Sequence, residues 1–101
     1  MDAARLMTAA ALIFTSILHA SAAGLADAPP GALSCSGCHP ANRAADIKVP
    51  RLIGRDPAEI VAAMHAFRSG ERSSTVMDRI AKGFSEDEVK AIAAWYGAQH
   101  D

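Results

Sequence analysis

The pentapeptide Cys35-Ser36-Gly37-Cys38-His39 combines two thiols with an imidazole at a spacing that suits covalent capture of a prosthetic group. Two thiols three residues apart in a helical turn lie on neighbouring faces, so each can add to one vinyl group of a porphyrin. The next residue then projects its imidazole toward the iron. This spacing is typical of c-type haem attachment. The sequence therefore predicts one haem c bound covalently through Cys35 and Cys38, with His39 as an axial iron ligand.

Three other interpretations compete with haem for this motif: a thioredoxin-like dithiol pair, half of a zinc site, and two structural cysteines. A thioredoxin-like pair is expected in a βαβ setting, which the sequence does not indicate. A zinc site would require His65 or His100 to converge with His39, at spacings that match no common zinc pattern. A disulfide between residues three apart would close almost no loop and stabilise the fold little. Haem attachment is the favoured interpretation.

Two methionines beyond the N-terminal segment, Met64 and Met77, are candidates for the sixth iron ligand. Met64 falls on an apolar helical stripe with Ile60 and Phe67, where a methionine usually fills the core. Met77 follows a Ser/Thr-rich connection outside a regular helix, from which it could fold over the open face of the haem. The pattern favours Met77, with Met64 as the alternative.

A thioether ligand favours Fe(II) over Fe(III) and so raises the reduction potential of a haem. With His39 and Met77 in both axial positions, no substrate can reach the iron, and we expect an electron carrier, not an enzyme. If Met77 does not reach the iron, the open position could turn over peroxide or bind a gas. A small haem-free binding module is a third class. The other ring N–H of His39 should donate to a backbone carbonyl, for which the loop around Pro50 is the expected place.

The N-terminal segment is typical of a secretory signal peptide. Arg5 precedes an apolar run over residues 6–18, and small residues follow at 20–23. The run has about 13 residues, whereas a membrane-spanning helix needs roughly 20. We therefore expect residues 1–23 to be cleaved, which leaves a monohaem domain over residues 24–101 in the periplasm with no membrane span.

The bulk properties of the chain agree with one small domain that has help from a cofactor. Its net charge is -1 and its charges are mixed along the chain, so no basic stripe indicates nucleic acid. About 78 residues would remain after cleavage, a size at which a hydrophobic core alone is marginal. A buried prosthetic group would supply the missing apolar contacts.

The periodicity of the mature region predicts an all-α fold with no strand. Asp56-Pro57-Ala58-Glu59 is a helix start, which predicts a helix over about 57–68, closed by Ser69-Gly70. Ser85-Glu86-Asp87-Glu88 is a capping box that begins a terminal helix, expected to stop near Gly97. The weaker expectations are two helical turns over 32–39, a loop over 40–55 and a short helical turn over 77–82.

The chain resembles class I cytochromes c over the whole mature region, and three segments carry the resemblance. The loop 49–54 (Val-Pro-Arg-Leu-Ile-Gly) looks like the Gly-Pro-x-Leu-x-Gly segment of that class. The runs 66–71 (Ala-Phe-Arg-Ser-Gly-Glu) and 74–85 (Ser-Thr-Val-Met-Asp-Arg-Ile-Ala-Lys-Gly-Phe-Ser) are similar to the cytochrome subunit of sulfide dehydrogenase, the flavocytochrome c family.

This resemblance implies roles for single residues and for a partner. It implies that Met77 is the sixth iron ligand, and that the carbonyl of Pro50 accepts the hydrogen bond from His39. It also implies a small class I fold around one haem and an FAD-containing partner subunit that oxidises sulfide. Because the segment before Cys35 is short and broken by prolines, the N-terminal helix of the class should be reduced here.

Overall fold

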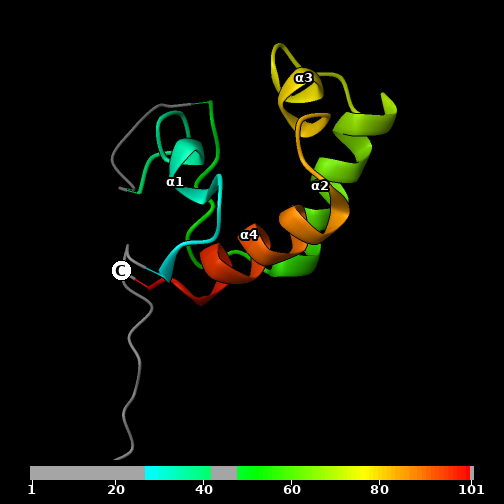
Figure 1. Cartoon of the computed structure of the whole chain (residues 1–101). Coiled ribbons are helices and arrows are strands. Elements are labelled where there is room, and N and C mark those ends of the chain that lie inside the picture. Colours follow the sequence, from blue (N-terminus) through cyan, green and yellow to red (C-terminus); the bar gives the residue numbers. More distant parts are fainter. Residues whose placement is uncertain (1–26, 42–47, 101) are drawn as a thin grey trace, which may run out of the picture.

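The computed structural model describes residues 27–41 and 48–100, and this part of the chain forms four helices and no strand. Figure 1 shows α1 on one side of the molecule and α3 on the other, with α4 running between them. The helices are α1 Ala32–Cys35, α2 Pro57–Ser69, α3 Met77–Ala81 and α4 Glu86–Ala98. The all-α prediction is confirmed. The predicted signal peptide, residues 1–23, lies outside the described residues.

Helix α2 begins and ends where the sequence predicts. The side chain of Asp56 accepts a hydrogen bond from the backbone N–H of Ala58 at 2.9 Å, and Pro57 occupies the first turn. These two features satisfy one free N–H group and fix φ at the helix start. Gly70 ends the helix with φ of 81°, a left-handed conformation that glycine adopts without steric cost.

Helix α4 begins as predicted, but it ends one residue later. The Ser85 hydroxyl accepts from the N–H of Glu88, and the Glu88 carboxylate accepts from the N–H of Ser85, which is a complete capping box. The helix runs through Gly97 to Ala98, so the predicted end near Gly97 is confirmed to within one residue. A Cβ at Gly97 would lie 2.6 Å from Cγ of Pro57. The glycine lets α4 approach the start of α2 closely.

The two short helices differ in detail from the predicted helical turns. Helix α1 covers four residues, Ala32–Cys35, and the chain continues to His39 in tighter turns. This agrees with the expected reduction of the N-terminal helix. Helix α3 covers Met77–Ala81, which confirms the predicted helical turn over 77–82 to within one residue, and Met77 is the first residue of this turn.

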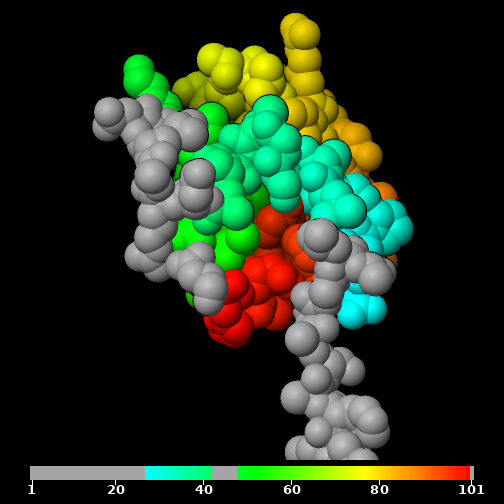
Figure 2. Space-filling view, turned by 90° about the vertical axis from the view of Figure 1, so that its left-hand side faces the viewer, coloured from blue at the N-terminus to red at the C-terminus, as the bar shows by residue number. Residues whose placement is uncertain are grey.

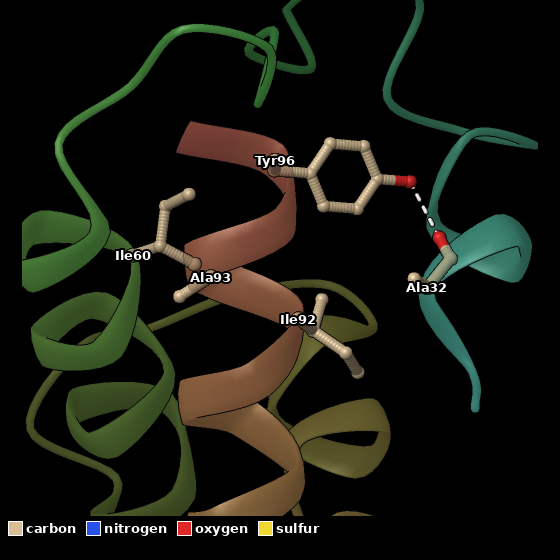
Figure 3. Packing of buried hydrophobic residues seen from close by; sticks show 5 residues of the cluster. All are labelled: Ala32, Ile60, Ile92, Ala93 and Tyr96. Atoms are coloured by element: carbon tan, nitrogen blue, oxygen red, sulfur yellow. Dashed lines mark hydrogen bonds between the residues drawn. The ribbon is translucent and has the colours of Figure 1, made fainter. Parts of the chain in front are cut away.

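The core lies around α4, which contacts both α1 and α2, while α2 also packs against α3. In the space-filling view, α1 (teal) faces the viewer between the yellow segment of α3 above and the red end of α4 below (Figure 2). Figure 3 shows side chains from three helices meeting in the buried cluster. The members of this cluster are Ala32, Ile60, Ile92, Ala93 and Tyr96.

Over residues 27–41 and 48–100, no helix combines the length and the apolar character that crossing a bilayer requires.

Candidate functional site

A cavity of about 650 Å³ brings the predicted site residues together. Its volume falls within the range of small-molecule and cofactor pockets. Because residues of α1 and α3 both line it, the cavity spans the space between these helices, which lie on opposite sides of Figure 1. The predicted residues in the lining are Cys35, Cys38, His39, Pro50, Met64 and Met77.

Both cysteines stand at the C-terminal end of α1, as free thiols. Cys35 is half-buried and Cys38 is exposed. Burial raises the pKa of the Cys35 thiol. The Cys35 thiol lies 3.6 Å from the carbonyl oxygen of Gly31, to which it donates a weak hydrogen bond. Both thiols border the same cavity, so a group inside it could be bonded by both.

His39 is oriented by the loop that follows it in sequence. Its Nδ1 lies 2.6 Å from the carbonyl oxygen of Pro50. A carbonyl can only accept, so Nδ1 carries the hydrogen and donates it. In a neutral imidazole the proton on Nδ1 leaves a lone pair on Nε2, and this nitrogen can ligate a metal. The half-buried ring therefore has the tautomer that an axial iron ligand needs.

The two methionines differ in their surroundings, although both line the cavity. Met64, in the middle of α2, packs against the buried cluster around Ile60 and Tyr96. Met77 is the half-buried first residue of α3 and is not part of that cluster. Met64 therefore has a packing role that Met77 lacks, which supports Met77 as the ligand.

Hydrogen bonds that the sequence analysis did not anticipate hold the start of α3. The Ser74 hydroxyl accepts from the backbone N–H of Asp78 at 2.9 Å and donates to the Asp78 carboxylate at 3.2 Å. These bonds satisfy a free N–H in the first turn of the helix that begins with Met77. The Ser-x-x-x-Asp spacing is a weak signal, because such pairs also occur on solvated faces.

The charged residues of the cavity wall are all basic. Lys48, Arg55 and Arg72 contribute to the lining, and none of the described lining residues is acidic. The guanidinium of Arg72 lies 4.8 Å from the ring centre of Phe67, a cation–π contact that fixes its position. A ligand that carries carboxylates would balance this charge.

The residues of the competing zinc interpretation lie apart from the thiols. His65 is exposed and borders a separate cavity of about 220 Å³, while His100 is exposed and borders neither cavity. Over the described ranges, no three or more His, Cys, Asp or Glu side chains are grouped so that they could hold a metal ion.

The donor set fits a haem c: two thiols, an imidazole with an available Nε2 and a thioether border one cavity whose wall is otherwise mostly apolar. Together with the all-α architecture of the described residues, this donor set fits the small class I cytochrome c fold.

Comparisons with known proteins confirm the resemblance to cytochromes c. No protein-family model matches the chain. The chain is 40% identical over 65 residues to the cytochrome subunit of sulfide dehydrogenase of Chlorobaculum tepidum, which covers 64% of this chain and 59% of that relative. It is 39% identical over 69 residues to the thiosulfate dehydrogenase electron acceptor of Stutzerimonas stutzeri, over 66% of this chain and 32% of the relative.

A second thiosulfate dehydrogenase electron acceptor, that of Thiomonas intermedia, is 38% identical over 81 residues, which are 76% of this chain and 36% of the relative. The matched part of the chain thus spans less than two thirds of the length of each of these relatives.

Proposed function

We propose that this chain is an exported electron carrier with one covalent haem c. The thiols of Cys35 and Cys38 would each add across a vinyl group: sulfur bonds to one carbon, the thiol hydrogen goes to the other, and nothing is oxidised or released. The placement of both thiols beside one cavity with His39 and Met77 supports this attachment.

The chain's own residues would then set the coordination of the iron. Nε2 of His39 would ligate from one side, because the Pro50 carbonyl holds the proton on Nδ1. The thioether of Met77 would ligate from the other. The haem supplies a one-electron couple, and His/Met ligation keeps this couple at a comparatively high potential. Lys48, Arg55 and Arg72 would balance the propionates.

We propose that the electron donor is an FAD-containing subunit of a sulfide-oxidising flavocytochrome c in the periplasm. The similarity to the cytochrome subunit of sulfide dehydrogenase supports this partner. A second candidate is a free carrier that accepts electrons from another dehydrogenase. The two similar proteins named as thiosulfate dehydrogenase electron acceptors support that alternative.

Covalent haem is tested by expressing the full chain with the c-type haem ligation machinery. We expect an intact mass greater than that of the polypeptide by one haem, and haem stain that stays with the chain under denaturing electrophoresis. The Cys35→Ala/Cys38→Ala double variant should lose both signals. A colourless wild-type protein with the mass of its polypeptide alone would contradict the proposal.

The partner is tested by affinity capture of the haem-loaded chain from its native cells. A permanent subunit should co-purify with a flavoprotein at a fixed ratio, and sulfide should reduce the haem in that complex. A free carrier should purify alone and be reduced only when a dehydrogenase and its substrate are added. Purification alone, with no reduction by sulfide in the presence of the native extract, would contradict the flavocytochrome assignment.

A further inference from the structure

The hydroxyl of Tyr96 connects α4 to the turn that carries both cysteines. It lies 2.5 Å from the carbonyl oxygen of Ala32, the bond drawn in Figure 3, and 2.8 Å from the hydroxyl of Ser36. Tyr96 is 2% exposed and Ala32 is fully buried. Tyr96 is thereby joined to Ala32 by a buried hydrogen bond and to Ser36 by a partly buried one, across 64 and 60 positions of sequence.

The direction of these two hydrogen bonds follows from the groups involved. The Ala32 carbonyl can only accept, so the single hydroxyl hydrogen of Tyr96 goes to it. Ser36 must therefore donate its own hydroxyl hydrogen to the Tyr96 oxygen. Burial also raises the pKa of the Tyr96 phenol, so the phenol keeps its proton and remains a donor. The three residues form a chain of hydrogen bonds with one direction.

The backbone between Leu33 and Cys38 has the hydrogen bonds of a 3₁₀ turn. Three successive N–H groups, those of Ser36, Gly37 and Cys38, each donate to the carbonyl three residues earlier at 3.2 Å. The Ala32 carbonyl accepts from the Tyr96 hydroxyl and the Ser36 hydroxyl donates to that same hydroxyl, so Tyr96 ties the first residue of α1 to the tighter turn that follows the helix.

The tighter turn determines where the two thiols point. In a 3₁₀ turn, residues three apart are eclipsed. In an α-helix, which advances by about 100° per residue, the same two residues would be rotated by roughly 60° relative to each other. Cys35 and Cys38 both border the large cavity, as eclipsed side chains would.

We infer that Tyr96 is a positioning residue for haem attachment: through Ala32 and Ser36 it holds the Cys35–Cys38 turn in the 3₁₀ form, which presents both thiols to the same cavity. This inference rests on the proposed covalent haem. Without the Tyr96 hydroxyl, the turn relaxes toward the α-helical hydrogen-bond pattern. In the fraction of chains whose turn has relaxed, one thiol faces away from its vinyl group, and attachment stops after a single thioether bond.

The inference is tested by counting thioether bonds in haem-loaded full-length protein. After denaturation, a thiol-alkylating reagent marks any cysteine that has not reacted, and peptide masses give the fraction of haem-bearing chains with a free thiol. Tyr96→Phe keeps the ring and removes only the hydroxyl. An ordinary hydrogen bond corresponds to roughly 2- to 12-fold in an equilibrium, so we expect the singly attached fraction to rise about as much.

Three further variants separate positioning from a general loss of stability. Ala93→Gly loosens α4 in the buried cluster without touching the hydroxyl network, and it should keep two thioether bonds. Ser36→Ala should raise the singly attached fraction less than Tyr96→Phe does, whereas Ser36→Thr, which retains the hydroxyl, should match the wild type. If Tyr96→Phe does not accumulate, the comparison of Ser36→Ala with Ser36→Thr decides the matter.

The outcomes distinguish this inference from the proposed function. Wild-type protein without haem would refute both. Wild-type protein with two thioether bonds, combined with a Tyr96→Phe variant that also has two, would refute only the positioning role. An equal rise in Tyr96→Phe and Ala93→Gly would assign the effect to stability and refute the positioning role as well.

Discussion

The imidazole of His39 and the backbone carbonyl of Pro50 are joined by a hydrogen bond of 2.6 Å. An acceptor that belongs to the backbone cannot rotate away or change its charge, so it holds the ring and its tautomer more firmly than a side chain would. Proline at this position limits the φ angle of the loop and thereby the direction of the carbonyl. The ring nitrogen available to iron is therefore selected by the chain itself.

Replacing Met77 with alanine should remove the proposed sixth iron ligand. We expect loss of the near-infrared absorption band that a thioether ligand gives ferric haem. We also expect a fall in reduction potential on the order of 0.1–0.3 V, within the ~0.8 V range over which axial ligands set it. Met64→Ala is the matched control, which should keep the band and lower the free energy of unfolding by about 2 kcal/mol. If the band persists in Met77→Ala and disappears in Met64→Ala, the ligand assignment is wrong.

Ser74→Ala should loosen the Met77 ligand without removing it. The substitution deletes the hydroxyl that bonds the N–H and carboxylate of Asp78 at the start of α3. The loss of such a bond at a helix start costs about 1 kcal/mol, so exogenous cyanide should displace Met77 from ferric haem roughly fivefold more easily. Ser73→Ala is the control, because the neighbouring serine makes no hydrogen bond in the structure. Equal displacement rates in the two variants would show that this bond does not support the ligand.

Gly97→Ala should destabilise the contact between α4 and the start of α2. The added methyl group would lie 2.6 Å from Cγ of Pro57 and 2.9 Å from the Arg55 carbonyl oxygen. Overpacking of this kind costs about 1–3 kcal/mol, measurable by urea unfolding of the haem-loaded protein. Adding Pro57→Ala should restore part of the loss, since the ring is one of the two obstacles. Independent, additive effects of the two substitutions would argue against the close approach.

The capping box of α4 should make stability depend on pH under acidic conditions. The pKa of Glu88 is held below its ordinary value of 4.5 by its hydrogen bonds with the backbone and hydroxyl of Ser85. The unfolded chain then binds this proton more tightly than the folded chain, so stability rises with pH. The charged Glu88 carboxylate stabilises the folded chain above pH 4.5. This stabilisation is lost as the pH falls through the pKa of Glu88 in the folded chain.

Glu88→Gln tests this dependence, since glutamine can still accept the hydrogen bond but does not titrate. The difference in unfolding free energy between wild type and variant should shrink as the pH is lowered from about 6 toward about 3. Glu86→Gln, at a position outside the capping box, is the control and should show a difference that changes less with pH. A difference for Glu88→Gln that stays constant with pH would contradict this account.

The parts of the fold that sequence predicts well are those set by local hydrogen bonds. Asp56 with Pro57 and Ser85 with Glu88 are short-range signals, and α2 and α4 begin where these signals place them. Gly97 lies near the predicted end of α4, but its second role, a close approach to Pro57, is not a local signal. Which residue lies opposite a glycine depends on how two helices pack, and local sequence does not contain that information.

The candidate site likewise contains residues that local motifs reveal and residues whose roles depend on contacts distant in sequence. The cysteines, His39 and Pro50 lie near one another in sequence and were singled out from motifs. The roles of Ser36 and Tyr96 depend on a contact across 60 residues. The spacing of Tyr96 from Val89 and Ile92 predicts only that its ring lies on the apolar face of the helix, and not what its hydroxyl reaches.

The wall of the large cavity is mostly apolar, and its charged residues are all basic. This composition has a consequence for the chain before it binds haem. The basic side chains of the wall repel one another, and the apolar lining is exposed to water until a ligand fills the cavity. On the proposed function, newly made polypeptide without haem should therefore unfold more often, and be cut by proteases more readily, than the chain that holds haem. Degradation would then remove haem-free chains, so that few of them compete for the redox partner.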